Sequence, residues 1–131
     1  SSGRNLPAYI HKTAYINPDA KVEPGAVIYP MVNVDKNSTI GRGALLNNSV
    51  VISHDNNIGS CSYISPGAVT SGFVSIGSGT FVGSGAVISN GVAIMKNCTI
   101  GIGSVVTKNV PEGKSAIGNP LRILKKKLRI E

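Results

Sequence analysis

An aliphatic residue recurs every six positions through most of this sequence. Stepping by six from Ile10 to Val106 meets seventeen positions, and all of them except Thr70 hold isoleucine, leucine or valine. A second series lies two residues before each aliphatic and holds small or β-branched residues, with Asn56 as its exception. Because positions two apart on a strand share a face, both series predict side chains that point into one interior.

The repeat unit is too short to hold two antiparallel strands and their turn. Each hexapeptide should therefore be one short strand followed by one bend, and three bends close a triangular coil whose neighbours stack about 4.8 Å apart by parallel pairing. Glycine recurs three residues after the aliphatic, where a bend needs a permissive backbone: Gly25, Gly43, Gly67, Gly79, Gly85, Gly91 and Gly103. The sequence predicts an all-β prism, a parallel β-helix, over residues 5–111.

The residue just before each aliphatic should point outward, and these residues form three columns, one for each side of the prism. Two columns are apolar and the third is mostly polar. In that order they read Tyr9, Val27, Leu45, Tyr63, Phe81, Thr99; then Tyr15, Asn33, Val51, Val69, Val87, Val105; then Lys21, Thr39, Asn57, Ser75, Ala93, Pro111. Two apolar sides and one wetted side are typical of a prism that packs in a closed ring, so we expect a homotrimer.

Charge and cysteine content bear on partners and location. The net charge is +7, and much of the excess lies near the C-terminus, which favours a small polyanionic ligand over nucleic acid, with a solvated tail as an equal alternative. No apolar run approaches the ~20 residues of a membrane span. The spacing of Cys61 and Cys98 matches neither a metal-binding motif nor a redox motif. This predicts free thiols and a cytoplasmic protein. The first four residues, 1–4, resemble the remains of an expression tag.

The candidate chemistry centres on His54, which follows Ile52 by two residues and should point outward. Gly72 lies one coil further on, about 5 Å away by strand spacing. Acyl transfer needs a base for the acceptor's proton and a donor for the oxygen that becomes negative. An imidazole can act as the base near neutral pH. A glycine N–H, which a ligand can approach closely, can act as the hydrogen-bond donor. His11, in the first coil, is predicted to be structural.

Position by position, His54-Asp55, residues 64–72, residues 101–111 and 118–120 resemble a family of hexapeptide-repeat sugar acyltransferases. These are the sialic acid O-acetyltransferase type and the related nucleotide-amino-sugar N-acetyltransferases. The resemblance implies left-handed winding, no metal, and transfer of an acetyl group from acetyl-CoA to an amine or hydroxyl of a sugar or sugar nucleotide. It also implies that His54 is the general base, that Asp55 tunes or orients it, and that the Gly72 N–H binds the thioester oxygen.

The same resemblance implies a path for acetyl-CoA, with the pantetheine arm between neighbouring subunits and the adenine end at the last coils. Arg122 or Lys125 would pair with the phosphates. Tyr63 stands where many relatives have a second histidine, which would alter contacts at the site or merely extend the apolar column. The implied binding residues are Gly72, Ser71, Ser89, Asn90, Thr107, Lys108, Gly118, Asn119 and Pro120.

Beyond Pro111 the repeat ends, and residues 112–131 form a C-terminal extension. Leu121, Leu124 and Leu128 are at helical spacing. They predict a short amphipathic helix that docks on the last coil.

Two other classes of function remain open on the sequence. A γ-type carbonic anhydrase shares the prism but needs three zinc-binding histidines, and this chain has two. A non-catalytic β-helix scaffold, such as an ice-binding protein, would favour a flat face of repeated threonines, whereas the polar column is irregular.

The acyltransferases that this sequence resembles usually carry an N-terminal α/β domain for the sugar nucleotide. The sequence leaves open whether this is an excised catalytic domain or a prism that recognises its acceptor alone.

Overall fold

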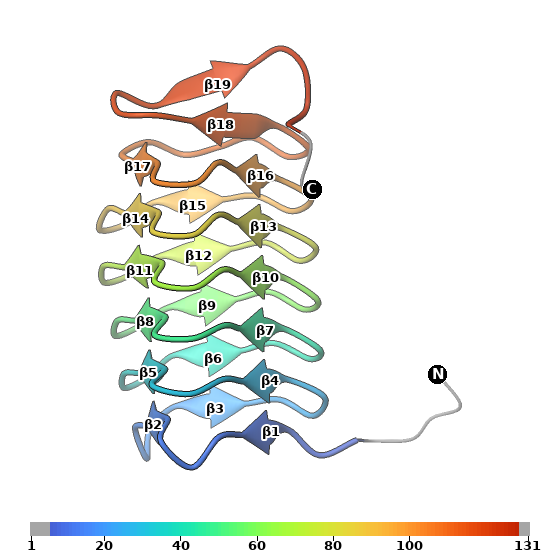
Figure 1. The fold of residues 1–131 in the computed structure, drawn as a ribbon, viewed down its shortest axis with the longest axis vertical. Coiled ribbons are helices and arrows are strands. Elements are labelled where there is room, and N and C mark those ends of the chain that lie inside the picture. Colours follow the sequence, from blue (N-terminus) through green and yellow to red (C-terminus); the bar gives the residue numbers. More distant parts are fainter. Residues whose placement is uncertain (1–5, 129–131) are drawn as a thin grey trace.

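The computed structural model describes residues 6–128, and these residues form a left-handed parallel β-helix without an α-helix (Figure 1). The expected all-β prism is confirmed. No helix that could cross a membrane occurs within that range. The predicted tag at residues 1–4 lies outside the described residues.

Short strands stack into three sheets, here named A, B and C, one for each side of the prism (Figure 1). Sheet A contains β1 (Tyr9–Ile10), β4 (Val27–Ile28), β7 (Leu45–Leu46), β10 (Tyr63–Ile64), β13 (Phe81–Val82), β16 (Thr99–Ile100), β18 (Ser115–Ile117) and β19 (Arg122–Leu124). Sheet B contains β2 (Tyr15–Ile16), β5 (Asn33–Val34), β8 (Val51–Ile52), β11 (Val69–Thr70), β14 (Val87–Ile88) and β17 (Val105–Val106). Sheet C contains β3 (Lys21–Val22), β6 (Thr39–Ile40), β9 (Asn57–Ile58), β12 (Ser75–Ile76) and β15 (Ala93–Ile94).

The strand register confirms the predicted columns. Tyr63 pairs with Phe81 in sheet A, and Val87 pairs with Val105 in sheet B, so partners lie one full coil apart. Sheets A and B therefore present the two apolar columns outward, and sheet C presents the polar one.

The aliphatic series fills the interior of the prism. Ile28, Leu46 and Ile64 are completely buried, and burial of each such side chain contributes about 1.5–3 kcal/mol to folding. Thr70, the exception in the series, is buried as well. Ile10 is 43% exposed because it belongs to the first coil, and no other coil of residues 6–128 covers its outer side.

Every turn position three residues after the aliphatic, from residue 25 to residue 103, has a left-handed backbone. Seven of these positions hold the glycines that the sequence pattern predicted, and the other seven hold residues with side chains at φ between 55° and 62°. Asparagine and aspartate adopt this conformation more readily than other residues with side chains. The second set is Met31, Asn37, Ser49, Asp55, Cys61, Phe73 and Asn97.

The predicted C-terminal helix is wrong. The segment instead forms β19, which pairs antiparallel with β18, and Leu121 is buried over the last coil. The end of a β-helix leaves a strand edge with unpaired backbone groups, and an extended segment satisfies them directly. A helix of so few residues gains little stability by itself. The open edge of β18 therefore overrides the helical spacing of the leucines.

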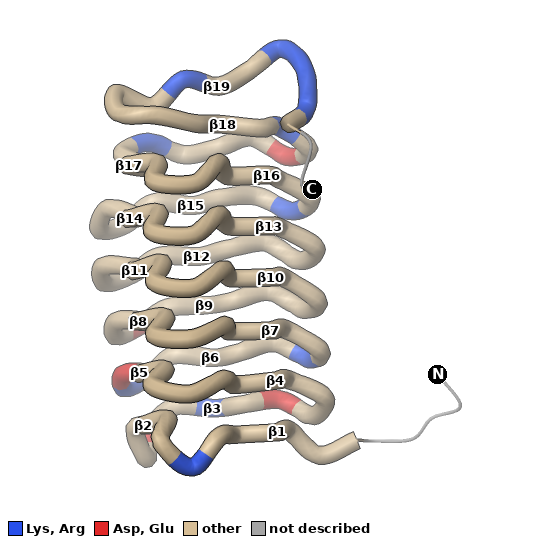
Figure 2. Tube along the Cα trace, in the orientation of Figure 1, with Lys and Arg blue, Asp and Glu red and all other residues tan. Residues whose placement is uncertain are grey.

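Lysine and arginine residues are concentrated at the C-terminal end of the prism, along β19 and the segment that follows it (Figure 2). No residue from 56 to 95, a stretch that includes β10 to β14, is a lysine, arginine, aspartate or glutamate (Figure 2). The predicted concentration of positive charge at one end is confirmed.

Candidate active site

His54 lies in the turn between β8 and β9, within the row of turns that joins sheet B to sheet C. We call this row the B–C corner; it includes residues 53–56, 71–74 and 89–92. The turn is held by the Asp55 N–H, which donates to the carbonyl of Lys36 on the preceding coil at 3.0 Å. The side chain of His54 is 40% exposed, so it points outward as the sequence predicted.

Asp55 fixes the orientation of the imidazole. One of its carboxylate oxygens, Oδ2, lies 2.9 Å from Nδ1 of His54. An ionised carboxylate only accepts hydrogen bonds, so in the neutral imidazole the contact favours the tautomer with the hydrogen on Nδ1 and the lone pair on Nε2. The contact with Asp55 therefore orients the His54 ring, which is the geometry that the role predicted for Asp55 requires.

Gly72 lies directly against this imidazole from the next coil. A β-carbon at Gly72 would come within 2.6 Å of both Cε1 and Nε2 of His54, and 3.1 Å from Nδ2 of Asn90. Its carbonyl accepts a hydrogen bond from the Gly91 N–H at 3.0 Å, whereas its own N–H has no acceptor among residues 6–128. The corner thus combines a bare imidazole nitrogen with a free backbone donor.

Asn56 ties the two turns of the corner together, a feature that the sequence signalled only as an exception to the small series. Its side chain is buried, and Nδ2 donates to the carbonyls of His54 and Ser71, each at 2.9 Å. Its Oδ1 is buried without a partner among the described residues, so the amide carries a desolvation cost. The residue before Gly72 is thereby held to the turn of His54.

The second exception to the repeat also lies at this corner. Ser53 donates from Oγ to the carbonyl of Thr70 at 2.6 Å, and its N–H donates to Oγ1 of Thr70 at 3.1 Å. Both sequence exceptions, Asn56 and Thr70, therefore replace apolar packing with hydrogen bonds next to His54. Their coincidence was a signal for the site that the sequence already contained.

Phe73 was not predicted as a site residue. Its ring meets the His54 imidazole edge to face, with centroids 5.2 Å apart and planes at 90°, and its side chain is 61% exposed. Its N–H donates to the His54 carbonyl at 3.1 Å. An aromatic wall therefore stands beside the base.

The structure places the predicted cofactor residues in one row along the corner. Ser71 and Ser89 follow β11 and β14, and their N–H groups bond to the carbonyls of Ile88 and Val106 on the next coils at 2.9 Å. Asn90 lies beside Gly72, and Thr107 and Lys108 follow β17 one coil further, where both are exposed.

The segment of residues 118–120 begins over the start of β17, at the strand that leads into Thr107 and Lys108. The Gly118 N–H donates to Oγ of Ser104, and its carbonyl accepts from the Val105 N–H, both at 3.2 Å. Asn119 and Pro120 follow and are exposed.

The two basic candidates lie at opposite ends of β19. Arg122 pairs with Ile117, next to Gly118, whereas Leu124 pairs with Ser115 at the far end of β18. Lys125 follows Leu124 and so extends away from the segment of residues 118–120. Of these two, the geometry favours Arg122 as the side chain near that segment.

Tyr63 and His11 lie away from His54 within one chain. The Tyr63 ring stacks on Phe81 with centroids 5.3 Å apart, and its hydroxyl accepts from Nδ2 of Asn47 at 2.9 Å. Tyr63 thus extends the apolar column of sheet A. His11 contacts Thr13 through Nδ1 at 2.9 Å in the first coil.

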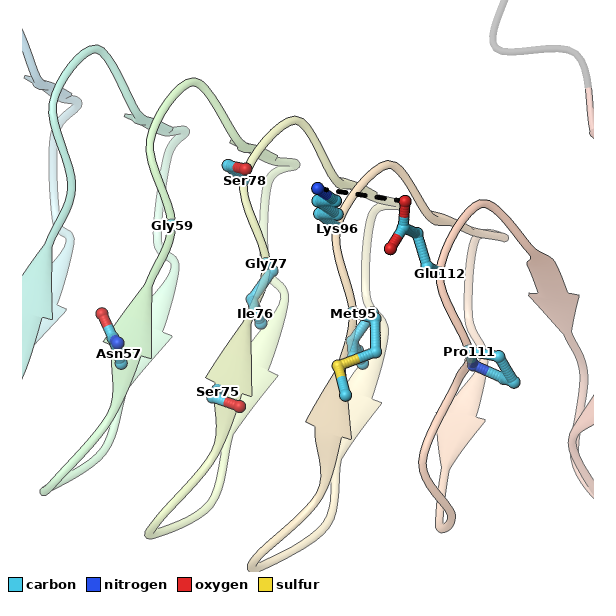
Figure 3. A pocket seen from close by; sticks show the side chains of 11 residues that line it. Asn57, Gly59, Ser75, Ile76, Gly77, Ser78, Met95, Lys96, Pro111 and Glu112 are labelled. Carbon is cyan, nitrogen blue, oxygen red and sulfur yellow. Dashed lines mark ion pairs between the residues drawn. The ribbon is translucent and has the colours of Figure 1, made fainter.

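Among the grooves formed by residues 6–128 are two that His54 does not line. One, of about 680 Å³, crosses sheet C at Asn57 and Ser75 and is bordered by Lys96 and Glu112, whose charged groups are 4.0 Å apart (Figure 3). The other, of about 490 Å³, includes Tyr9 and His11. Neither groove contains a base beside a free backbone donor, so we assign the chemistry to the B–C corner. No group of three or more His, Cys, Asp or Glu suited to a metal ion occurs within residues 6–128.

Comparison of the sequence with models of protein families gives no match, and comparison with curated proteins gives none either. Solved structures do match. The acetyltransferase domain of PglB from Neisseria gonorrhoeae is 31% identical with a TM-score of 0.91, over 93% of this chain and 60% of that one. PerB from Caulobacter crescentus, solved with CoA and GDP-perosamine, is 32% identical with a TM-score of 0.91, over 93% of this chain and 59% of that one.

A third match is WeeI from Acinetobacter baumannii, 32% identical with a TM-score of 0.84, over 88% of this chain and 57% of that one. This chain therefore spans about three-fifths of the length of these proteins. Structural neighbours of the chain are sugar N-acetyltransferases with this β-helix, which confirms the resemblance found in the sequence.

Proposed function

We propose that this chain transfers an acetyl group from acetyl-CoA to an amine or hydroxyl of a sugar or sugar nucleotide. The observation that carries the proposal is the contact between His54 and Gly72 on adjacent coils, with Asp55 holding the opposite nitrogen of the ring. This arrangement offers a proton acceptor and an oxyanion donor at one point, which are the two groups that acyl transfer requires.

His54 acts as the general base in this proposal. Its Nε2 accepts the proton that the acceptor's amine or hydroxyl loses as the acceptor nitrogen or oxygen bonds to the acetyl carbon. The Gly72 N–H donates to the acetyl oxygen while that oxygen is negative. When the carbon–sulfur bond breaks, His54 returns the proton to the departing sulfur, so the base is regenerated. Asp55 stabilises the imidazolium between these two proton transfers.

Acetyl-CoA supplies the activated thioester, and the row of residues along the B–C corner would hold it. Because Gly72 has no side chain, a ligand carbonyl can reach its N–H beside His54. Ser89, Asn90 and Thr107 offer polar groups along the same row, and Arg122 offers a cation near its end. These residues fit a long ligand with an acyl group at one end and phosphates at the other.

The solved neighbours support this proposal. The PglB acetyltransferase domain has been solved in complex with acetyl coenzyme A. The GDP-perosamine N-acetyltransferase from Caulobacter crescentus has been solved with CoA and GDP-perosamine as a variant in which one histidine is replaced by alanine. That enzyme is 31% identical to this chain.

The proposal includes a homotrimer. The outer columns of sheets A and B are apolar along the prism, and Tyr9, Tyr15, Tyr63 and Val87 remain exposed on them in the single chain. Contiguous exposed apolar surface of this kind is typical of subunit contacts. A neighbouring subunit against sheet B would close a groove along the row that begins at Ser71.

A thiol-release assay tests the function directly. The full chain is mixed with acetyl-CoA and a panel of 4-amino sugar nucleotides and sialic acids, and free CoA is followed with a thiol reagent. We expect turnover with at least one of these acceptors and an acetylated product by mass spectrometry. Release of CoA that no acceptor increases would contradict the proposal.

A further inference from the structure

Phe73 occupies a position that its side chain disfavours. It is one of the turn positions with a left-handed backbone, at φ 58°, where half of the residues from 25 to 103 are glycine. A bulky residue in this region is a conformational outlier. Among the turns in that range, Phe73 and Met31 are the two that carry a large apolar side chain there.

Neither backbone conformation nor core packing explains this phenylalanine. The ring is 61% exposed, so it adds little to the buried interior. Its ring contact among the described residues is the edge-to-face one with His54, at 5.2 Å between centroids. Strained residues of this kind occur where a side chain is needed at a functional site.

The chain direction decides on which side of the site the ring stands. Ser71, Gly72 and Phe73 cross the corner in that order, from β11 in sheet B toward β12 in sheet C. The proposed row for acetyl-CoA includes Ser71 and Ser89, which directly follow strands of sheet B. Phe73 therefore lies toward sheet C, away from the strands that begin that row.

Sheet C offers what a sugar needs next to such a ring. Ser75, two residues after Phe73, and Asn57, three residues after His54, both line the open groove on this sheet (Figure 3). A sugar ring has apolar C–H faces as well as hydroxyls, and binding sites combine aromatic walls with a few placed polar groups for such ligands.

We propose that Phe73 is a specificity-determining residue that packs against the apolar C–H face of the acceptor sugar. The contact would place the sugar's amine or hydroxyl at Nε2 of His54, with the polar edge of the ring toward sheet C. This inference rests on the acetyl transfer proposed above. It assigns the acceptor to the sheet C side of the corner and the thioester to the sheet B side.

Phe73→Gly gives the sharpest test, because glycine removes the ring and also relieves the left-handed backbone. The variant should melt at or above the wild-type temperature. Its KM for the best acceptor of the assay above should rise about tenfold, while its KM for acetyl-CoA stays unchanged. Phe73→Tyr and Phe73→Trp, which keep an aromatic face, should keep a KM near that of the wild type.

Met31→Gly is the matched control. Met31 has the same backbone conformation, at φ 62°, and is 65% exposed, but it lies in a turn between sheets A and B. Its replacement should affect the melting temperature in the same direction and leave both KM values unchanged.

Several results would overturn the inference. An unchanged acceptor KM in Phe73→Gly would show that the ring does not touch the sugar. A lower kcat with an unchanged KM would show that the ring acts on His54, and a changed oligomeric mass would place it at a subunit contact. If the wild type acetylates no sugar, the proposed function fails first and this inference falls with it; if the wild type is active and Phe73→Gly is indistinguishable from it, this inference alone fails.

Discussion

The imidazole of His54 fills the space that a side chain at Gly72 would occupy. A β-carbon there would approach Cε1 and Nε2 to 2.6 Å, far closer than non-bonded carbon and nitrogen atoms come. Gly72 does not have the left-handed φ of the glycines at the bends, so space and not backbone freedom requires glycine at this position. A base and a backbone donor can share one point because one of them has no side chain.

Gly72→Ala should therefore disable the site without changing the backbone. The added methyl group must displace the imidazole, and we expect transfer to fall about 10²–10³-fold as the oxyanion donor and the base lose their alignment. The thiol-release assay measures this loss. In a His54→Ala background the same methyl group meets no ring, so Gly72→Ala should lower the free energy of unfolding less there than in the wild type, as a urea double-mutant cycle would show. Equal costs in the two backgrounds would contradict the shared space.

His54→Ala should lower acetyl transfer by about 10²–10⁴-fold, the usual contribution of a positioned general base. Because the side chain is partly exposed and lies outside the core, the melting temperature should change little. Calorimetry should show that CoA still binds. His11→Ala, in the first coil, is the matched control and should retain wild-type turnover. Full activity of His54→Ala would remove His54 as the base.

Asp55→Asn tests the orienting carboxylate. Asparagine tolerates the left-handed backbone at this turn, where φ is 55°, so the fold should be kept. The neutral amide can hydrogen-bond either tautomer of His54, and we expect kcat to fall about tenfold or more because the productive one is no longer enforced. Asn37→Asp makes the reverse exchange at the same turn position one coil earlier, where φ is 58°, and should leave kcat unchanged. A wild-type kcat for Asp55→Asn would mean that the ring is oriented by other contacts.

The sequence was sufficient for the prism because its period is strict. Each coil repeats the same inward pair, so one register accounts for the burial of Ile28 and Ile64 and for the contact of His54 with Gly72. The C-terminal segment has no such period. The spacing of its leucines fits a helix, but the unpaired edge of β18 fixes its conformation, and that edge exists only after the coils have stacked.

Parts of the site could not be predicted for a different reason. No feature of the sequence distinguishes Phe73 as a site residue. An aromatic residue at a turn is common on protein surfaces, and the contact of Phe73 with His54 depends on side-chain rotamers. Asn56 and Thr70 were distinguishable in the sequence, as the two exceptions to the inward series. Their role at the site became apparent only from the hydrogen bonds that join them to the turns of His54 and Ser71.

Asn56→Ala tests whether this inward amide positions the site. The substitution removes the donor of the Ser71 carbonyl and leaves the His54 carbonyl with the Phe73 N–H alone, and we expect the free energy of unfolding to fall by about 1–3 kcal/mol. Transfer should fall by up to about 100-fold, because the turns that carry the base and Gly72 are no longer tied together. Ser62→Ala is the matched control: Ser62 is at the same inward position and donates to the Gly59 carbonyl at 2.6 Å, away from His54. The Ser62→Ala variant should lose stability but keep the wild-type kcat. A similar loss of kcat in both variants would show that Asn56 supports the fold in general and does not position the site.

Val87→Lys tests the proposed trimer and its link to the site. Val87 lies on the outer column of sheet B and is 42% exposed in the single chain, so a lysine there is harmless unless another subunit covers it. A buried, unpaired ammonium would be strongly disfavoured, and light scattering should show the mass fall from three chains toward one. Because the row for acetyl-CoA begins on the same sheet, transfer should fall with the mass. Thr39→Lys, on the polar column of sheet C, should remain trimeric; a trimer that survives Val87→Lys but dissociates with Thr39→Lys would place the subunit contact on sheet C instead.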